Sequence, residues 1–172
     1  MASSTKNIST EFIAQSIFRM QENVPRIQKC LDLLTEEQVW EKPNSSTNSI
    51  ANLILHLCGN IRQYINSSLG NQPDLRQRDN EFSVTDGLTK KELFSCIEST
   101  VNKAISVLEN LTEDELLKER SVQGFQFSGI GNVIHVVEHF SYHTGQIAIQ
   151  TKLLANKDLG FYADMDLNLK NE

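Results

Sequence analysis

The sequence predicts an all-α protein, built as a four-helix bundle with short accessory helices. Apolar residues recur at spacings of three and four over four long stretches, which is the period of an amphipathic helix. Three Thr-x-x-Glu/Gln motifs mark helix starts between or beside these stretches. Only one short stretch alternates polar and apolar side chains as a strand does. These observations together favour a bundle over any fold built on a sheet.

The first helical stretch covers residues 8–34. Its apolar positions follow the helical period and are Ile8, Phe12, Ile13, Ile17, Met20, Val24, Ile27, Leu31 and Leu34. Pro25 lies inside it, and because proline lacks an N–H we expect a kink or a break into two helices there. Thr35 and Gln38 then form a capping-box pattern that predicts a short helix ending near Trp40, followed by a loop over residues 42–48.

The second long helix is expected over residues 49–69, with Asn48 or Ser49 as its N-cap. Beside its apolar stripe runs a polar one, made of Asn52, His56, Asn60 and Gln63. A polar stripe is normally the solvated face of a helix. Apolar neighbours flank His56, however, so a position facing a partly buried cleft stays open as the alternative.

The second half of the chain repeats the same alternation of loops and helices. Residues 70–87 are predicted as a loop that either contacts a ligand or only crosses the bundle. A third helix starts at Thr89, and a short helix covers residues 112–117. Residues 121–127 are expected to be extended or hairpin-like, and the fourth helix runs from Ser128 to about Leu154. Residues 156–172 are expected to form a docked tail, so that residues 1–172 make a single domain.

Composition excludes several classes of function. The net charge of −6 argues against a nucleic-acid groove, and the few clustered arginines are expected to act locally. No apolar run approaches the ~18 residues that a membrane span requires, and the first ten residues lack the apolar core of a secretory signal. Cys30, Cys58 and Cys96 are odd in number and lie in apolar stretches, which predicts reduced, buried thiols in a cytoplasmic protein.

The histidines carry the strongest indication of chemistry. Three of the four lie at successive i+4 positions in the fourth helix: His135, His139 and His143. At ~1.5 Å rise per residue, neighbours in this series lie roughly 6 Å apart along the axis, and the outer two roughly 12 Å apart. One ion can therefore bind one neighbouring pair but not the outer pair. A third ligand must come from elsewhere, and the remaining histidine is His56.

Spacing alone leaves the choice of pair open. Gly145 follows His143 closely and would allow another helix to approach, which slightly favours the downstream pair. The HExxH order of zinc proteases is absent, because Glu138 precedes His139 instead of following the first histidine of a pair. Three imidazoles with a fourth position left to water are typical of a catalytic metal site. The alternative is a polar seam that binds no metal.

Two segments resemble the DinB-like family of metal-binding four-helix bundles, whose members are also called bacillithiol-transferase-like proteins. The first is the Ser49–Asn60 segment around His56, and the second runs from Glu138 through His139 and His143 to Gln146. The similarity extends from Phe12 to about Leu154 and includes the Arg78-Asp-x-Glu81-Phe82 loop.

The resemblance implies that His56, His139 and His143 bind a divalent metal ion, zinc or nickel before iron or manganese. It leaves His135 outside the set, and it implies a homodimer and one crossover connection in the bundle. Characterised relatives transfer low-molecular-weight thiols to electrophiles, so a metal-dependent thiol transferase or hydrolase acting on a small molecule is the first functional hypothesis. The second is a non-catalytic, stress-linked or structural protein in which the metal joins two helices.

Overall fold

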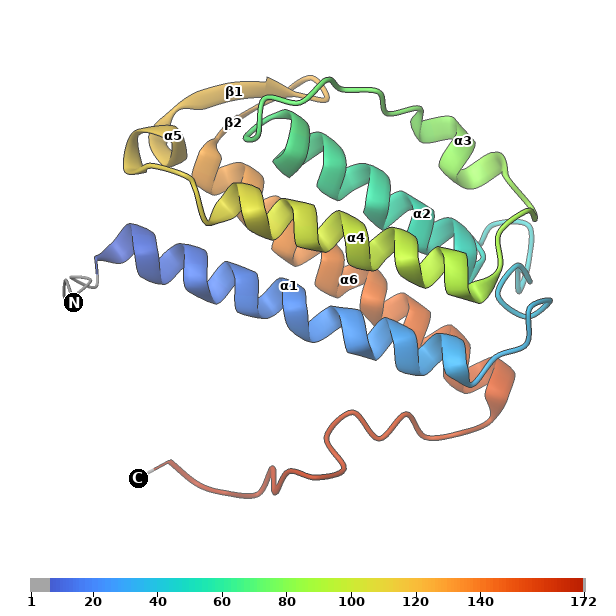
Figure 1. Cartoon of the computed structure of the whole chain (residues 1–172). Coiled ribbons are helices and arrows are strands. Elements are labelled where there is room, and N and C mark those ends of the chain that lie inside the picture. Colours follow the sequence, from blue (N-terminus) through green and yellow to red (C-terminus); the bar gives the residue numbers. More distant parts are fainter. Residues whose placement is uncertain (1–6, 172) are drawn as a thin grey trace.

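The computed structural model describes residues 7–171 and confirms the all-α fold class (Figure 1). Its four long helical segments are α1 (Ile8–Asp32), α2 (Ile50–Ile61) with its π-helical continuation η1 (Arg62–Ser67), α4 (Lys90–Leu108) and α6 (Gly129–Ala155). Helix α1 packs against α4 and α6, and α2 packs against the same two helices. The order around the bundle is therefore α1, α4, α2, α6.

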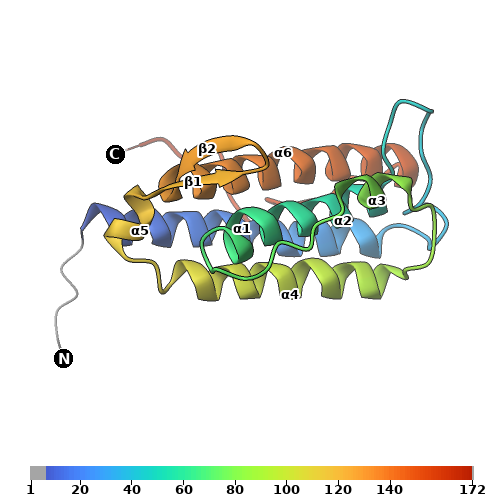
Figure 2. The same cartoon turned by 90° about the horizontal axis from the view of Figure 1, so that it is seen from above.

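A long crossover connects the second and third helices of the bundle. Helices α2 and α4 run in the same direction, opposite to α1 and α6, so the chain must return along the bundle between them (Figure 1). This return, over residues 68–89, carries α3 (Arg78–Ser83), which packs on α2. The prediction of a plain loop over residues 70–87 was therefore wrong in part, because its middle is helical and its Glu81 is buried. Figure 2 shows α3 lying over α2 from above.

Most predicted helix starts are confirmed by their capping bonds. The hydroxyls of Ser49, Thr89 and Thr112 each accept the N–H three residues on, at the starts of α2, α4 and α5 (Glu113–Leu117). Thr35 and Gln38 exchange the same pair of bonds, but residues 35–40 form turns and not the expected short helix. The Val39 carbonyl there accepts the N–H of Ala51 and so ties the turn to α2.

Of the two alternatives at Pro25, the break is wrong, since α1 continues through it to Asp32, and the kink stays a prediction. Proline deprives the carbonyl four residues earlier of its partner. Here both Pro25 and Gln21 lie on the exposed side of α1, so the carbonyl of Gln21 faces water and the helix can continue.

The expected hairpin is present ahead of α6. Strand β1 (Glu119–Val122) pairs antiparallel with β2 (Phe125–Ser128). Gln123 and Gly124 between them both have positive φ, as a two-residue hairpin turn requires. The hydroxyl of Ser128 then caps the first turn of α6, so the hairpin fixes where the histidine-bearing helix begins.

Within residues 7–171, no helix combines the length and the apolar character needed to cross a bilayer. The cysteine prediction holds for Cys30 and Cys58, which are buried, whereas Cys96 is only half-buried. The three thiols are free. The segment after α6 returns along α1, where Lys29 donates to the carbonyl of Gly160 at 3.0 Å.

Candidate metal centre

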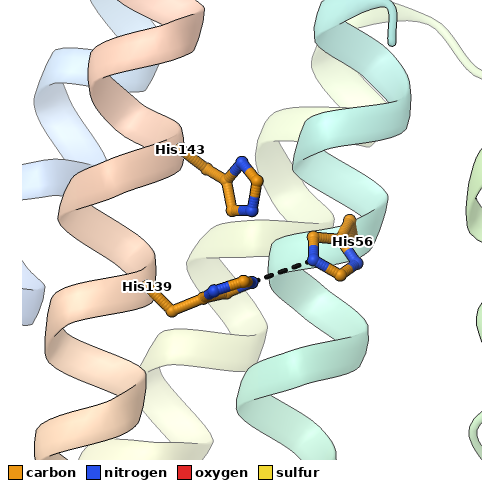
Figure 3. Close-up of side chains that lie close together, drawn as sticks. All are labelled: His56, His139 and His143. Atoms are coloured by element: carbon orange, nitrogen blue, oxygen red, sulfur yellow. Dashed lines mark hydrogen bonds between the residues drawn. The ribbon is translucent and has the colours of Figure 1, made fainter. Parts of the chain in front are cut away.

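Three histidines from two facing helices meet between α2 and α6. His56 projects from α2, and His139 and His143 project from successive turns of α6 toward it (Figure 3). One ring nitrogen from each of the three lies within 4.8 Å of the other two. The structure thus brings together the downstream pair and His56, and the three imidazoles could hold one metal ion.

Asn52, His56 and Asn60 of the polar stripe are buried and only Gln63 is half-buried, so the stripe is not a solvated face of this helix. His56 is 5% exposed, and Asn52 and Asn60 are more enclosed still. His143 is 9% exposed on the opposite side. Imidazoles this enclosed need partners for their ring nitrogens, because an unpaired buried polar group destabilises the fold.

The closest approach in the cluster joins the Nε2 atoms of His56 and His139, which lie 2.9 Å apart. Two nitrogens bound to one ion at ~2.1 Å lie roughly 3.0 Å apart at octahedral angles and roughly 3.4 Å apart at tetrahedral ones, so the observed distance is close to that of a shared metal. Without a metal, one of the two nitrogens must carry a proton and donate it to the other. A metal ion would take the place of that proton and accept both lone pairs.

The other nitrogen of His56 is held by a carboxylate. Glu81 Oε2 lies 2.9 Å from His56 Nδ1, and Arg76 donates to both oxygens of the same carboxylate, at 2.7 and 2.9 Å. Arg76 Nη2 also lies 3.2 Å from Nδ1, but a guanidinium can only donate and Glu81 can only accept. The shorter bond to Glu81 therefore places the proton on Nδ1, which leaves the Nε2 lone pair free for a metal.

The geometry of α2 makes room for this carboxylate. Gly59 lies one turn below His56, and a Cβ at Gly59 would come within 1.9 Å of Glu81 Oε1. The side-chain amide of Asn52 donates to the carbonyls of Glu81 and Val84, at 3.0 and 2.8 Å. These two residues of α2 dock α3 and deliver Glu81 to His56.

The electrostatics around Glu81 keep it ionised. Burial alone would raise its pKa, but the hydrogen bonds from Arg76 and His56 outweigh that effect and lower the pKa. The side chain of Arg76 is only 4% exposed, so this is a buried ion pair that holds one ring nitrogen of the cluster. Sequence reasoning found the Arg78–Phe82 stretch but assigned Glu81 no role.

A second partner orients His143. Its Nδ1 lies 2.8 Å from the side-chain oxygen Oε1 of Gln146, one turn further along α6. An amide oxygen can only accept, so Nδ1 carries the proton and Nε2 is left as the lone-pair nitrogen. His56 and His143 are thus both held in the form in which Nε2 can bind a metal.

Burial also keeps the α6 imidazoles neutral. Desolvation, with repulsion from the neighbouring imidazoles, lowers the pKa of His139 to about 3. Burial lowers the pKa of His143 as well, against the opposing hydrogen bond to Gln146. Neutral imidazole is the form that binds metals, so both residues are prepared for an ion at neutral pH.

His135 belongs to a different environment one turn earlier on α6. Its Nε2 lies 3.1 Å from the amide nitrogen of Asn60, and its ring stacks on Tyr64 at 4.2 Å between centroids. Since an amide NH₂ donates, the Nε2 lone pair of His135 is already used. His135 is therefore a neighbour of the cluster and not part of it.

The other residues that the sequence suggested as possible site residues lie around the histidine cluster. Glu138 is exposed on the outer side of α6, which removes it as a general base for the cluster. Tyr142 is 63% exposed and meets the ring of His143 edge-on at 5.0 Å. The ring of Phe82 in α3 lies 4.8 Å from the ring of His56, and the guanidinium of Arg78 lies 5.0 Å from the Phe82 ring. The arginine cluster is thus local, as predicted.

Stability should depend on pH through the α6 histidines in metal-free protein. Their pKa values are lowered from 6.5 by burial, to about 3 for His139. Between pH 6.5 and these lower pKa values, the unfolded chain binds more protons than the folded chain. The contribution of these histidines to the free energy of unfolding is therefore fully present above pH 6.5 and is lost as the pH falls. We expect urea unfolding midpoints to decrease from pH 7 to pH 5 in chelator-treated protein. A His139→Gln variant should show a weaker decrease, and equal slopes would contradict this assignment.

Known proteins resemble this chain in fold and in sequence profile. A conserved protein from Enterococcus faecalis matches 84% of this chain and 97% of its own, at 14% identity and a TM-score of 0.70. A DinB-like protein from Bacillus subtilis matches 86% of this chain and 96% of its own, at 18% identity and a TM-score of 0.66. A DinB-like protein from Bacillus cereus matches 77% and 86%, at 16% identity and a TM-score of 0.61.

No functionally curated protein matches the chain. The family described as "protein of unknown function (DUF1572)" matches residues 7–163, which is nearly the whole sequence. The DinB-like fold and the three-histidine cluster thus agree with the resemblance found in the two histidine segments. The chain belongs to this family of unknown function, and its fold is that of the DinB-like proteins.

Proposed function

We propose that this protein binds one divalent metal ion through Nε2 of His56, His139 and His143 and uses it to activate a small molecule. The observation that carries the proposal is the 2.9 Å approach of two imidazole nitrogens, one of which is oriented by a buried carboxylate. Three neutral imidazoles suit zinc and nickel best, and iron remains compatible with them. Three protein ligands leave a further coordination position for water or substrate.

The chemistry follows from the charge of such an ion. A divalent metal lowers the pKa of a bound water or thiol toward neutrality, so that a nucleophile is available at physiological pH. The protein's own residues set the geometry. Glu81 and Gln146 fix the ring orientations of His56 and His143, and Phe82 covers the outer face of His56. A low-molecular-weight thiol or water is therefore the proposed nucleophile, and a homodimer the proposed assembly.

A structural role is the second candidate, because the ligands come from two different helices and are largely buried. An ion between α2 and α6 would join these helices, and it would stabilise the folded protein by about 2.7 kcal/mol at a metal concentration of 100 Kd. Both roles share the same ligands and differ only in whether a substrate can reach the ion.

Metal content tests the ligand set. Protein purified without a histidine tag and loaded with zinc or nickel should hold about one ion per chain by elemental analysis. His139→Ala should lose this stoichiometric binding, because it removes the central ligand. His135→Ala is the matched control on the same helix and should keep it. Equal metal content in wild type and His139→Ala would overturn the proposal.

The carboxylate contact of His56 predicts a graded effect. Glu81→Gln removes the charge that orients Nδ1, and partners of this kind typically contribute about 10–100-fold to metal affinity. Gly59→Ala should weaken binding similarly, since the added methyl group would displace the carboxylate of Glu81. Competition titration with a chromophoric chelator measures both. Glu138→Gln, on the exposed side of α6, should leave the affinity unchanged.

Catalysis separates the two roles. Metal-loaded wild type should accelerate addition of a small thiol to a model electrophile, or hydrolysis of an activated ester. His139→Ala should reduce that rate to the uncatalysed one. A protein that binds the ion and gains thermal stability, yet shows the same rates with and without His139, would have the structural role instead.

A further inference from the structure

A second group of reactive side chains lies between α2 and α4, separate from the histidine cluster. Cys58 of α2 and Cys96 of α4 are neighbours across two helices that pack together. Arg62, one turn after Cys58, donates from Nη2 to Cys96 Sγ at 3.2 Å. Two thiols and a guanidinium thus meet at one point of the helix interface.

The two sulfurs of this pair differ in their access to solvent. Cys58 is 1% exposed, whereas Cys96 is half-buried. The contact with Cys58 lowers the pKa of Cys96 to about 6 against the effect of burial, with the positive charge of Arg62 acting in the same direction. Cys30 shows the contrast, because it is fully enclosed and burial raises its pKa.

A cavity leads to the pair from outside. It has a volume of about 470 Å³ and is lined by Cys58, Gly59 and Arg62 on the α2 side and by residues 72–77 of the crossover. A small polar oxidant can therefore reach Cys96 from its exposed side, whereas the cavity borders Cys58 and Arg62. Arg76 and Glu81 also line this cavity, but none of the three proposed metal ligands does.

We propose that Cys58 and Cys96 form a redox-active dithiol that peroxides convert into a disulfide, with Cys96 as the sulfur that reacts first. Three observations carry the inference: the two thiols are close together, Arg62 donates to Cys96, and Cys96 is the more exposed of the two sulfurs. It stands independently of the proposed metal-dependent function, because none of its groups is a proposed ligand.

The chemistry balances with a peroxide as the oxidant. The Cys96 thiolate attacks one peroxide oxygen, so that an S–O bond forms, the O–O bond breaks and hydroxide leaves to become water. The sulfur of Cys58 then attacks Cys96, losing its proton as the S–S bond forms and a second water leaves. Overall, two thiols lose two hydrogens and one hydrogen peroxide is reduced to two waters.

The wild-type protein provides a test that needs no variant. Reduced full-length chain treated with one equivalent of hydrogen peroxide should lose about 2 Da, and non-reducing peptide mapping should join the Cys58 and Cys96 peptides. Brief alkylation of the reduced protein should label Cys96 at least roughly tenfold faster than Cys30. A joined peptide that contains Cys30, or no joined peptide in excess peroxide, would overturn the proposal.

Variants assign the order of reaction. Cys58→Ser should stop at a sulfenic acid on Cys96 that dimedone traps, whereas Cys96→Ser should show neither the adduct nor the disulfide. Cys30→Ser is the matched control and should form the disulfide at the wild-type rate. Dimedone on Cys58 in place of Cys96 would reverse the assignment, and thermal melts of each variant verify that the bundle is folded.

Discussion

The arrangement of this protein around its histidines depends on one buried carboxylate, Glu81. It contacts His56 on one side and is held by Arg76 on the other, with distances of 2.7–2.9 Å. The crossover segment supplies both Glu81 and Arg76, whereas α2 supplies the histidine. The crossover therefore does more than connect α2 to α4: it determines which nitrogen of His56 carries the proton.

A buried carboxylate destabilises the fold unless its charge is compensated, and the residues that contact Glu81 provide this compensation. Arg76 supplies the opposite charge, and Gln63 in turn accepts from Arg76 at 2.8 Å. Gly59 supplies the space, and Asn52 fixes the backbone of Glu81 itself. Removing any one of these contacts would affect the orientation of His56, because they form one connected network.

The fold could be predicted because it depends on local periodicity, whereas the choice of His56, His139 and His143 came from the family resemblance, since spacing left the pair open. Apolar spacing located the long helices, and the four-residue spacing of His139 and His143 placed them on one face of α6. The role of Glu81 could not be predicted, since it depends on a contact across 25 residues of sequence. The crossover shows no apolar periodicity, and α3, with six residues, is too short to be predicted from such a pattern.

The smaller errors have the same origin in tertiary contacts. Thr35 and Gln38 form the expected capping bonds, yet residues 35–40 form turns instead of a helix. The carbonyl of Val39 accepts the N–H of Ala51 in α2, so it is not available to a continuing helix. Pro25 did not break α1, since the carbonyl that it leaves unpaired lies on the exposed side. In both cases the local sequence pattern was identified correctly, but the surroundings of the residues determined which structure formed.

The three histidines of α6 show how helix geometry divides similar residues between different tasks. Four residues correspond to about one turn and roughly 6 Å of rise, so successive histidines share one face of α6 at different levels along its axis. His139 and His143 lie at the level of His56, whereas His135, one turn earlier, lies beside Asn60 and Tyr64. Asn60 occupies the lone pair of His135 that a metal would need. The hydrogen bond from Asn60, together with the position of His135 one turn away, separates His135 from the cluster, so that the three nitrogens that could hold an ion belong to His56 and the downstream pair.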